Sequence, residues 1–325
     1  MTVFVIRRLM QSVVVLFIMS VVVFVGVFAI GNPVDILISP QADQLDRERA
    51  IHELGLDLPL WEQYLVFLWN ALHGNLGRSF AMSEPALRLI VERLPASLEL
   101  ALTAFLLSLV VGLPLGLWAG LRPKAVSSKT IMAGSILGFS LPTFWQGLVL
   151  IMVFAVMLGW LPSTGRGEAV VVLGIRSSLF TLDGWSHLVL PALNLALANT
   201  ALIIRLTRAG VREAVHQDYV RFARAKGLQP SRIVFVHVLR NILIPLVTVL
   251  GLELGGLIAF GVVTETIFAW PGMGKLLIDS IYRLDRPVVV AYLMMIVFLF
   301  IIINLAVDIL YSIIDPRVRL TDVKS

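Results

Sequence analysis

The 325-residue sequence contains no cysteine and little charge, and both absences exclude classes of protein. Without cysteine the chain has no disulfide, no thiolate nucleophile and no cysteine metal ligand. Charged residues make up 14% of the chain, against about a quarter in a soluble globular domain. The five histidines are scattered, and neither an HExxH motif nor an EF-hand loop occurs. We therefore expect no metal site, no cofactor and no catalytic site.

A nucleotide-binding loop is also absent. No stretch matches GxxxxGKS or GxxxxGKT, the glycine-rich loop that cradles phosphates. The nearest stretch, PGMGKLL at residues 271–277, has Ala269 at the position of the first glycine and Leu276 after the lysine. We therefore expect that the chain is not an enzyme and that any ATP driving it is bound by another subunit.

Apolar residues are abundant instead: they make up 58% of the chain, and the mean hydropathy is +0.91. A helix needs roughly 20 apolar residues to cross the hydrocarbon core of a bilayer. Six segments are long enough, at residues 9–31, 97–120, 131–160, 187–207, 241–264 and 288–312. The first exceeds the core of a cleavable signal peptide, about 7 to 15 residues, so we expect it to be retained. The sequence predicts an all-α, polytopic membrane protein with six transmembrane helices.

Proline and glycine positions predict how these helices bend and pack. Pro142, in the stretch SLPTF at residues 140–144, predicts a kink or a re-entrant start in the third segment. Small residues recur at every fourth position in the second and fifth segments: Gly112, Gly116 and Gly120, and then Gly251 and Gly255. This spacing lets helix backbones approach closely, so we expect tight helix packing there.

The charged residues predict the orientation in the membrane, because Lys and Arg accumulate on the cytoplasmic side. With the N-terminus inside, sixteen of the 26 Lys and Arg residues are cytoplasmic, whereas fourteen of the 21 acidic residues are outside. Both termini are therefore predicted to be cytoplasmic. The excess of basic residues on the cytoplasmic side of the membrane accounts for the net charge of +5. We therefore expect no nucleic-acid partner.

Residues 57–73 predict an amphipathic helix on the outer side, before the second span. Trp61, Tyr64, Leu65, Leu68 and Trp69 follow i, i+3, i+4 spacing. We favour a helix that packs on other helices or lies at the membrane interface over a ligand site, since Trp gathers at headgroup level.

Few polar side chains fall inside the predicted spans. Glu253, in the stretch LGLELGG, lies about halfway along the fifth segment, where an unpaired carboxylate is costly. It is a candidate for the lining of a translocation path, and equally for a hydrogen-bonded contact with a partner subunit. Asn194 and Asn199 in the fourth segment are further path candidates, although interhelical hydrogen bonding explains asparagines in spans more simply.

A basic segment separates the fourth and fifth spans on the cytoplasmic side. Residues 217–227 predict a helix that starts near Asp218 and stops at Gly227. Tyr219, Phe222 and Ala223 share one apolar face of this helix. From composition alone, it could be an amphipathic helix on an anionic membrane surface.

The segment resembles the cytoplasmic EAA loop of binding-protein-dependent ATP-binding-cassette permeases. That loop reads E-A-A, three residues, Gly, nine residues and I-x-L-P; here Ala223, Gly227 and Leu239 keep the pattern, whereas Arg221 and Phe222 replace its first two residues. DYVRFARAKGL and HVLRNILIPLVT are similar to the variant of the dipeptide, oligopeptide and nickel branch. Further matches follow in order along nearly the whole chain: RRL, ELGLDLPLWEQY, GNLGRSF, RLPASLEL, SLPTFWQGL, TETIFAWPGMGKLLIDSI and NLAVDILYSIIDPRVR.

The resemblance implies a type I importer permease bundle in the bacterial inner membrane, with one peripheral helix before a five-helix core. The implied partners are a second homologous permease, two cytoplasmic ATP-binding subunits and an extracytoplasmic substrate-binding protein. The loop helix would dock in a groove of the ATP-binding subunit and transmit its closure to the spans. The implied coupling residues are the docking contacts Tyr219, Phe222 and Ala223, the rim charges Arg221, Arg224 and Lys226, and Gly227 at the turn.

The expected organisation is an N-terminal helix with an outer segment (residues 1–96), a permease core (97–312) that contains the coupling loop (212–240), and a cytoplasmic tail (313–325). Peptides are the expected cargo, with nickel, glutathione or another small solute as alternatives within the family. A self-sufficient, proton-coupled secondary transporter that uses Glu253 is the alternative from another class.

Overall fold

The structure is a computed structural model, and it describes residues 2–29, 51–52 and 57–314. The described residues are mainly helical, and the strands among them form one short hairpin. The chain divides into two compact units: Met1–Pro95 with Gly272–Ile301, and Ala96–Pro271 with Ile302–Ser325. We call them the first and the second unit. The predicted all-α class is confirmed.

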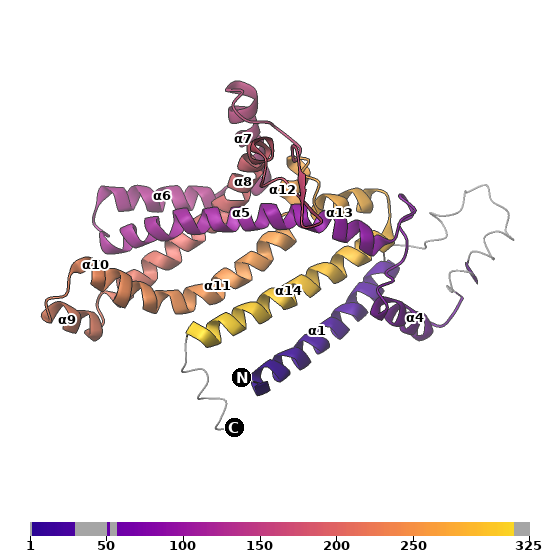
Figure 1. Cartoon of the computed structure of the whole chain (residues 1–325), viewed down its shortest axis with the longest axis horizontal. Coiled ribbons are helices and arrows are strands. Elements are labelled where there is room, and N and C mark those ends of the chain that lie inside the picture. Colours follow the sequence, from indigo (N-terminus) through magenta and orange to yellow (C-terminus); the bar gives the residue numbers. More distant parts are fainter. Residues whose placement is uncertain (1, 30–50, 53–56, 315–325) are drawn as a thin grey trace. The chain divides into compact units, whose positions relative to one another are not determined.

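Five helical stretches of the described chain are long and apolar enough to cross a membrane, and a bent pair of helices makes a sixth if the pair is one broken span. The five are α1 (Thr2–Ala29), α5 (Ala86–Leu121), α8 (Leu182–Ala214), α11 (Leu239–Phe260) running into α12 (Val262–Ile267), and α14 (Arg286–Ile314) (Figure 1). Each predicted segment corresponds to one of these spans. The last residues of the first predicted segment and the end of the predicted tail lie outside the described residues.

The sixth span is broken where the sequence predicts it. Helix α6 (Val126–Ser140) and the stretch made of α7 (Thr143–Leu150) and the π-helix η1 (Ile151–Met157) meet at an angle of 105°. In a continuous helix the Gly138 carbonyl would accept from residue 142, but Pro142 has no N–H. Gln146 Nε2 donates instead to the carbonyls of Gly138 and Leu141, at 2.8 Å each. This side chain satisfies the acceptors that the proline leaves open, which is required where no water reaches them.

In the first unit, α1 packs against the short amphipathic helix α4 (Leu60–Leu72). Ser20 and Tyr64 share a hydrogen bond of 2.8 Å, and the Phe24 ring lies 5.3 Å from the Tyr64 ring. No residue of α4 is buried, and Trp61 and Trp69 are exposed. The predicted helix is confirmed, and its exposed tryptophans suit the headgroup level of a bilayer.

The same unit contains a turn that is held by one buried carboxylate. Asp285, which follows α13 (Met273–Tyr282), is 1% exposed. It accepts hydrogen bonds from the Ser79 hydroxyl and from the backbone N–H groups of Phe80 and Ala81, the latter two at 3.0 and 3.4 Å. A buried charge is tolerated where several donors surround it. The turn at residues 79–81 is therefore tied to the segment just before α14.

In the second unit, glycines bring α5 and α8 into close contact. A Cβ atom at Gly112, Gly116 or Gly120 would lie 2.8, 2.6 or 2.6 Å from side-chain atoms of Ile203, Thr207 and Val211, respectively. Gly251 of α11 has the same role toward α14, because its Cβ would lie 2.1 Å from Val307. The predicted tight packing is confirmed at Gly112, Gly116, Gly120 and Gly251.

Two short parts complete the second unit. On the outer side, β1 (Val170–Val172) and β2 (Ile175–Ser177) form an antiparallel hairpin whose two turn residues, Leu173 and Gly174, both have positive φ. On the cytoplasmic side, α9 (Asp218–Ala225), α10 (Pro230–Arg232) and the π-helix η2 (Ile233–Val238) connect α8 to α11 (Figure 1).

Replacing Gly116 with alanine should destabilise the protein, although alanine is the better helix former. The added methyl group would lie 2.6 Å from Thr207 Cβ and 2.9 Å from the Ile204 carbonyl oxygen, so α5 and α8 would have to separate. Overpacking of this kind costs about 1 to 3 kcal/mol. We expect a lower melting temperature of the purified protein in detergent, measured by intrinsic fluorescence.

The matched control is Gly134→Ala in α6, where no atom lies within 4 Å of the added Cβ. We expect this variant to be as stable as the parent or slightly more stable. Equal melting temperatures for the two alanine variants would contradict the close packing of α5 on α8.

Candidate functional site

Helix α9 is held in place by an apolar cluster on one of its sides. Val220 and Ala223 are 0% and 4% exposed. They belong to what we call the loop core, whose buried members are Val211, Ala214, Val220, Ala223, Ile233, Val238 and Ile242. These residues come from α8, α9, η2 and α11. The loop core therefore fixes the short helix to the cytoplasmic ends of two spans.

The opposite side of α9 is exposed and carries aromatic and basic side chains. Phe222 is 63% exposed and Tyr219 38% exposed. Lys226 Nζ lies 4.6 Å from the centre of the Phe222 ring, and Arg221 lies 3.6 Å from Asp218. Apolar patches rimmed by polar residues mark interaction sites, and Tyr219 and Phe222, three residues apart on the helix, form a small patch of this kind.

The structure separates residues that the sequence places on one face. Ala223 packs in the loop core, whereas Phe222 is exposed. Successive residues of a helix are about 100° apart, and the buried arc of α9 is centred between Val220 and Ala223. Only the tertiary contacts determine which part of an eight-residue helix is buried.

Gly227 ends α9 in a Schellman motif. Its φ is +72°, and its N–H donates to the Arg224 carbonyl at 2.9 Å. The N–H of Leu228 donates to the Ala223 carbonyl at 3.3 Å, and the Leu228 side chain packs against the loop core. Glycine adopts this backbone conformation without strain. The predicted stop of the helix at this residue is confirmed.

The polar candidates within the spans lie apart from α9. Asn194 is 0% exposed, and its Nδ2 donates to Thr264 Oγ1 at 3.0 Å. Asn199 is 6% exposed on the same helix, α8. Glu253 of α11 is half-buried and has no hydrogen bond or ion pair within the described part of the chain. The structure thus joins Asn194 to α12, and it does not join either asparagine to Glu253 by a hydrogen bond.

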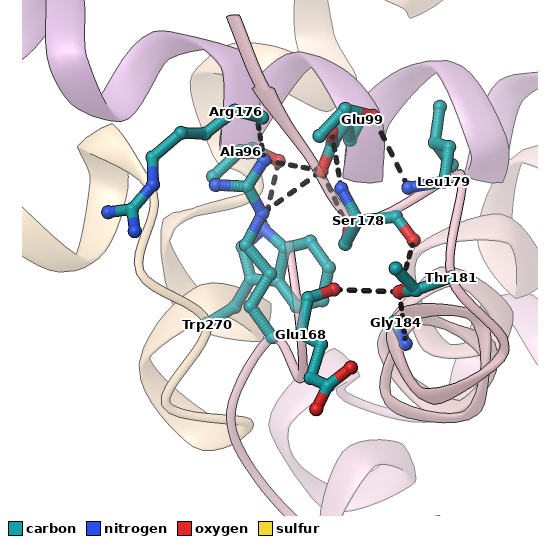
Figure 2. A network of polar contacts seen from close by, with 11 residues as sticks. Ala96, Glu99, Glu168, Arg176, Ser178, Leu179, Thr181, Gly184 and Trp270 are labelled. Carbon is teal, nitrogen blue, oxygen red and sulfur yellow. Dashed lines mark hydrogen bonds and ion pairs between the residues drawn. The ribbon is translucent and has the colours of Figure 1, made fainter. Parts of the chain in front are cut away.

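A buried ion pair lies at the outer end of α5, where the sequence did not indicate one. Glu99 is 7% exposed and accepts hydrogen bonds from Arg166 Nε at 3.1 Å and Nη2 at 2.7 Å. It also accepts from the backbone N–H of Ser178 at 3.1 Å and from the Ser178 hydroxyl at 2.9 Å (Figure 2). Four donors thus compensate the desolvation of the carboxylate.

This network ties the segment between η1 and α8 to α5. Arg166 Nη2 also donates to the carbonyl of Arg176 at 2.7 Å, so the ion pair holds the β1–β2 hairpin. Trp270, which is fully buried, donates from Nε1 to the Ala96 carbonyl at 2.8 Å beside it (Figure 2). Glu99 lies near the end of a span, from which the sequence predicts that it reaches the membrane interface, but the structure buries it in this ion pair. Its partner is 67 residues away, and no local spacing in the sequence indicates the pair.

Replacing Glu99 with alanine should destabilise the protein much more than replacing Glu92 with alanine. The first change leaves the Arg166 side chain, 12% exposed, without its carboxylate, a loss of about 3 to 5 kcal/mol for a buried pair. Glu92 pairs with Arg88 at 2.8 Å on an exposed surface, where screening by water leaves little stabilisation. Melting temperatures of both variants check this.

A double-mutant cycle that adds Arg166→Ala separates the pair from the loss of side-chain packing. The double variant should lose much less stability than the sum of the losses of the two single variants. Fully additive losses, or equal effects of Glu99→Ala and Glu92→Ala, would contradict the buried pair.

The apolar spans and the basic loop with its short helix are those of a multi-pass membrane protein. The chain belongs to the family of binding-protein-dependent transport system inner membrane components: the family model matches residues 112–320, and the model of the N-terminal part matches residues 1–101. The resemblance to this family is confirmed.

Relatives match along most of the chain. It is 43% identical over 302 residues to the di/tripeptide transport system permease protein DppB of Pseudomonas aeruginosa, covering 89% of this chain and 90% of the relative. It is 39% identical over 321 residues to the oligopeptide transport system permease protein AppB of Bacillus subtilis, covering 98% and 100%. Among solved structures, an inward-facing MetNI methionine ABC transporter matches with a TM-score of 0.56 and 21% identity, covering 72% of this chain and 100% of that chain. The last match shows a shared fold.

Proposed function

We propose that the chain is a permease subunit of an ATP-driven importer of di- and oligopeptides. The observation that carries this proposal is the extent of the similarity to permeases of di/tripeptide and oligopeptide transport systems, which covers 89% and 98% of the chain. Nickel, glutathione or another small solute is the alternative cargo, because a separate extracytoplasmic substrate-binding protein would select the cargo. In this proposal residues 97–312 form the permease core, and residues 1–96 add a peripheral helix and an outer segment.

The chain would form half of the translocation pathway with a second homologous permease, and two cytoplasmic ATP-binding subunits would drive it. Helix α9 is the proposed contact with one of these ATP-binding subunits. Phe222 and Tyr219 would fill an apolar groove there, and Arg221, Arg224 and Lys226 would lie at the rim. Ala223 supports the contact from its buried side in the loop core.

The loop core explains how such a contact could move the spans. Because α9 is packed against residues of α8 and α11, a displacement of α9 must carry the ends of both helices with it. A rigid connection of this kind converts closure of the ATP-binding subunits into a rigid-body rotation of helices. Glu253, Asn194 and Asn199 are the proposed path residues inside the membrane.

Gly227→Asp should uncouple ATP hydrolysis from uptake. The αL backbone there and the added carboxylate at the helix C-terminus both disfavour the present end of α9. We expect membrane insertion to be unchanged and uptake by the reconstituted complex to fall at least tenfold, about 1.4 kcal/mol or more in coupling. Uptake of a radiolabelled dipeptide into proteoliposomes measures this.

Gly159→Asp is the matched control, because Gly159 also has a positive φ, also follows a helical stretch and also has no atom within 4 Å of a Cβ. The Gly159→Asp change introduces the same backbone strain at a position far from α9 in the sequence. Normal uptake by the Gly227→Asp complex would contradict the coupling role of the loop.

Phe222→Ala should weaken binding of the ATP-binding subunit without unfolding the permease, because the ring is exposed. Buried aromatic anchors at interfaces contribute about 2 kcal/mol or more, which corresponds to an affinity at least about 30-fold lower. Co-purification at decreasing concentrations of the ATP-binding subunit measures this. Phe180→Ala, at a ring that is 66% exposed in the predicted outer part, should bind normally. Equal binding by both variants would count against α9 as the contact.

The competing class is a self-sufficient secondary transporter in which Glu253 carries a proton. One observation supports this class: the Glu253 carboxylate has no partner within the described residues, as a proton-carrying group inside the membrane would require. Uptake driven by a pH gradient in the absence of ATP-binding subunits would support that class and contradict the importer.

A further inference from the structure

Helix α4 of the first unit has only apolar residues on its exposed surface. They are Leu60, Trp61, Leu65, Val66, Trp69 and Leu72, which are between 52% and 76% exposed. The polar residues Glu62, Gln63 and Asn70 of the same helix are half-buried. Soluble proteins rarely present a contiguous apolar surface to water, and such a surface marks contact with a membrane or with another protein.

One side of α4 packs on the spanning helix α1. The Tyr64 hydroxyl shares its hydrogen bond of 2.8 Å with Ser20. The Phe24 ring lies 5.3 Å from the Tyr64 ring and 5.8 Å from the Phe67 ring. Tyr64 and Phe67 therefore mark the side of α4 that faces α1.

The rest of the helix divides into an apolar and a polar sector, because successive residues are about 100° apart. What we call the apolar sector consists of Trp61, Leu65, Leu68, Trp69 and Leu72. What we call the polar sector consists of Glu62, Gln63, Val66 and Asn70. Together with the side on α1, each sector takes about a third of the circumference. A helix that lies flat in a membrane surface beside a spanning helix needs such a division, with one side each for its neighbour, the acyl chains and the headgroups.

The contacts with α1 give the depth of α4 in the bilayer. Arg8 marks one boundary of the hydrocarbon, because a charged side chain is costly inside it. About 30 Å of hydrocarbon takes about 20 helical residues, so the other boundary falls at about residue 28 of α1. Ser20 and Phe24 then lie about 12 Å and about 6 Å inside that boundary. The side chains of α4 that contact them therefore reach into the hydrocarbon, as in interfacial helices immersed by about 5 to 10 Å.

Lipid fits the apolar sector better than a further protein chain does. Only 12% of the apolar stretch of α1 is buried among the described residues, so lipid can surround the helix on which α4 packs. Trp61 and Trp69 are 63% and 66% exposed in the sector, and Trp gathers where acyl chains meet headgroups. The adjoining polar sector suits the headgroup layer, which a dry protein contact would not require.

We propose that α4 is embedded in the outer leaflet of the membrane, with its apolar sector on the acyl chains and its polar sector among the lipid headgroups. It anchors the segment between the first two spans to lipid. A soluble protein outside the cell can then reach the polar sector of α4 but not the apolar one. The inference goes beyond the proposed function, since it depends on neither the cargo nor the source of energy.

Two single-cysteine variants test the two sectors. Leu65 and Val66 are neighbours, they are 53% and 52% exposed, and they belong to the apolar and the polar sector, respectively. The chain has no cysteine of its own, so each introduced cysteine carries the only spin label in this subunit. The complex is purified through a tag on this subunit and reconstituted into lipid nanodiscs. The signal of the same complex without the introduced cysteine is subtracted.

Power saturation of the electron resonance signal then measures two accessibilities. Oxygen gathers among acyl chains, whereas nickel ethylenediaminediacetate stays in water. The label at Leu65→Cys should be accessible to oxygen and shielded from nickel, like a label at Val22→Cys, a 55% exposed position of α1. The label at Val66→Cys should be several-fold more accessible to nickel and about 5 Å shallower, half the diameter of a helix.

Three results would overturn the inference. High nickel accessibility at Leu65→Cys would place the apolar sector in water. Low accessibility to both reagents there would show that a protein chain, such as another subunit, covers the sector. Equal depths at Leu65→Cys and Val66→Cys would show that α4 does not lie between acyl chains and headgroups.

A second pair of variants tests the energetic side of the inference in unlabelled protein. Leu65→Asp places a carboxylate on the acyl chains, which is costly, whereas Asn70→Asp places one in the polar sector. Asn70 also lies closer to the C-terminus of α4, where a carboxylate is slightly unfavourable, so the comparison is conservative. We expect Leu65→Asp to lower the melting temperature in nanodiscs more than Asn70→Asp does. An equal or smaller loss for Leu65→Asp would contradict the embedded position.

Discussion

The apolar contact between α9 and the ends of α8 and α11 is the constraint on which the cytoplasmic side of this protein depends. An isolated helix of eight residues would not be stable in water, since helices shorter than about 12 to 15 residues are marginal by themselves. Val220 and Ala223 supply what the helix lacks, because they bury its inner side in the loop core. The same burial determines which side remains outward, and therefore which residues another protein can reach.

The two ends of the second unit are stabilised by different physical means. At the cytoplasmic end, apolar side chains and a glycine turn hold the loop. At the outer end, Glu99 and Arg166 form a charged pair that is buried and surrounded by donors. Between them, the glycines of α5 let α8 approach to backbone distance. A displacement at one end is therefore applied to helices that are packed firmly along their length.

Much of this architecture can be predicted from the sequence. The lengths of the apolar runs give the spans, Pro142 gives the break, and the glycines at every fourth position give the packing of α5 on α8. Gly227 marks the end of α9 because only a few residue types adopt its backbone conformation easily. All of these signals act over a few residues, which is why they can be read along the chain.

The features that the sequence does not predict depend on contacts between distant segments. Glu99 and Arg166 are 67 residues apart, and nothing in their local patterns links them. Ala223 and Phe222 are neighbours in one short helix, and only the packing of η2 and α11 decides that the first is buried.

The central claim is that α9 moves together with the spans, and spin-label distances test it directly. The chain has no cysteine, so cysteines introduced at Asp218 of α9 and at Leu106 of α5 are the sole labelling sites in this subunit. Both side chains are exposed, at 98% and 58%. Pulsed electron resonance on the complete complex should give one narrow distance that is the same without nucleotide and with ATP trapped. A distance that broadens or shifts between the two states would show that α9 moves independently of the helices and would contradict the claim.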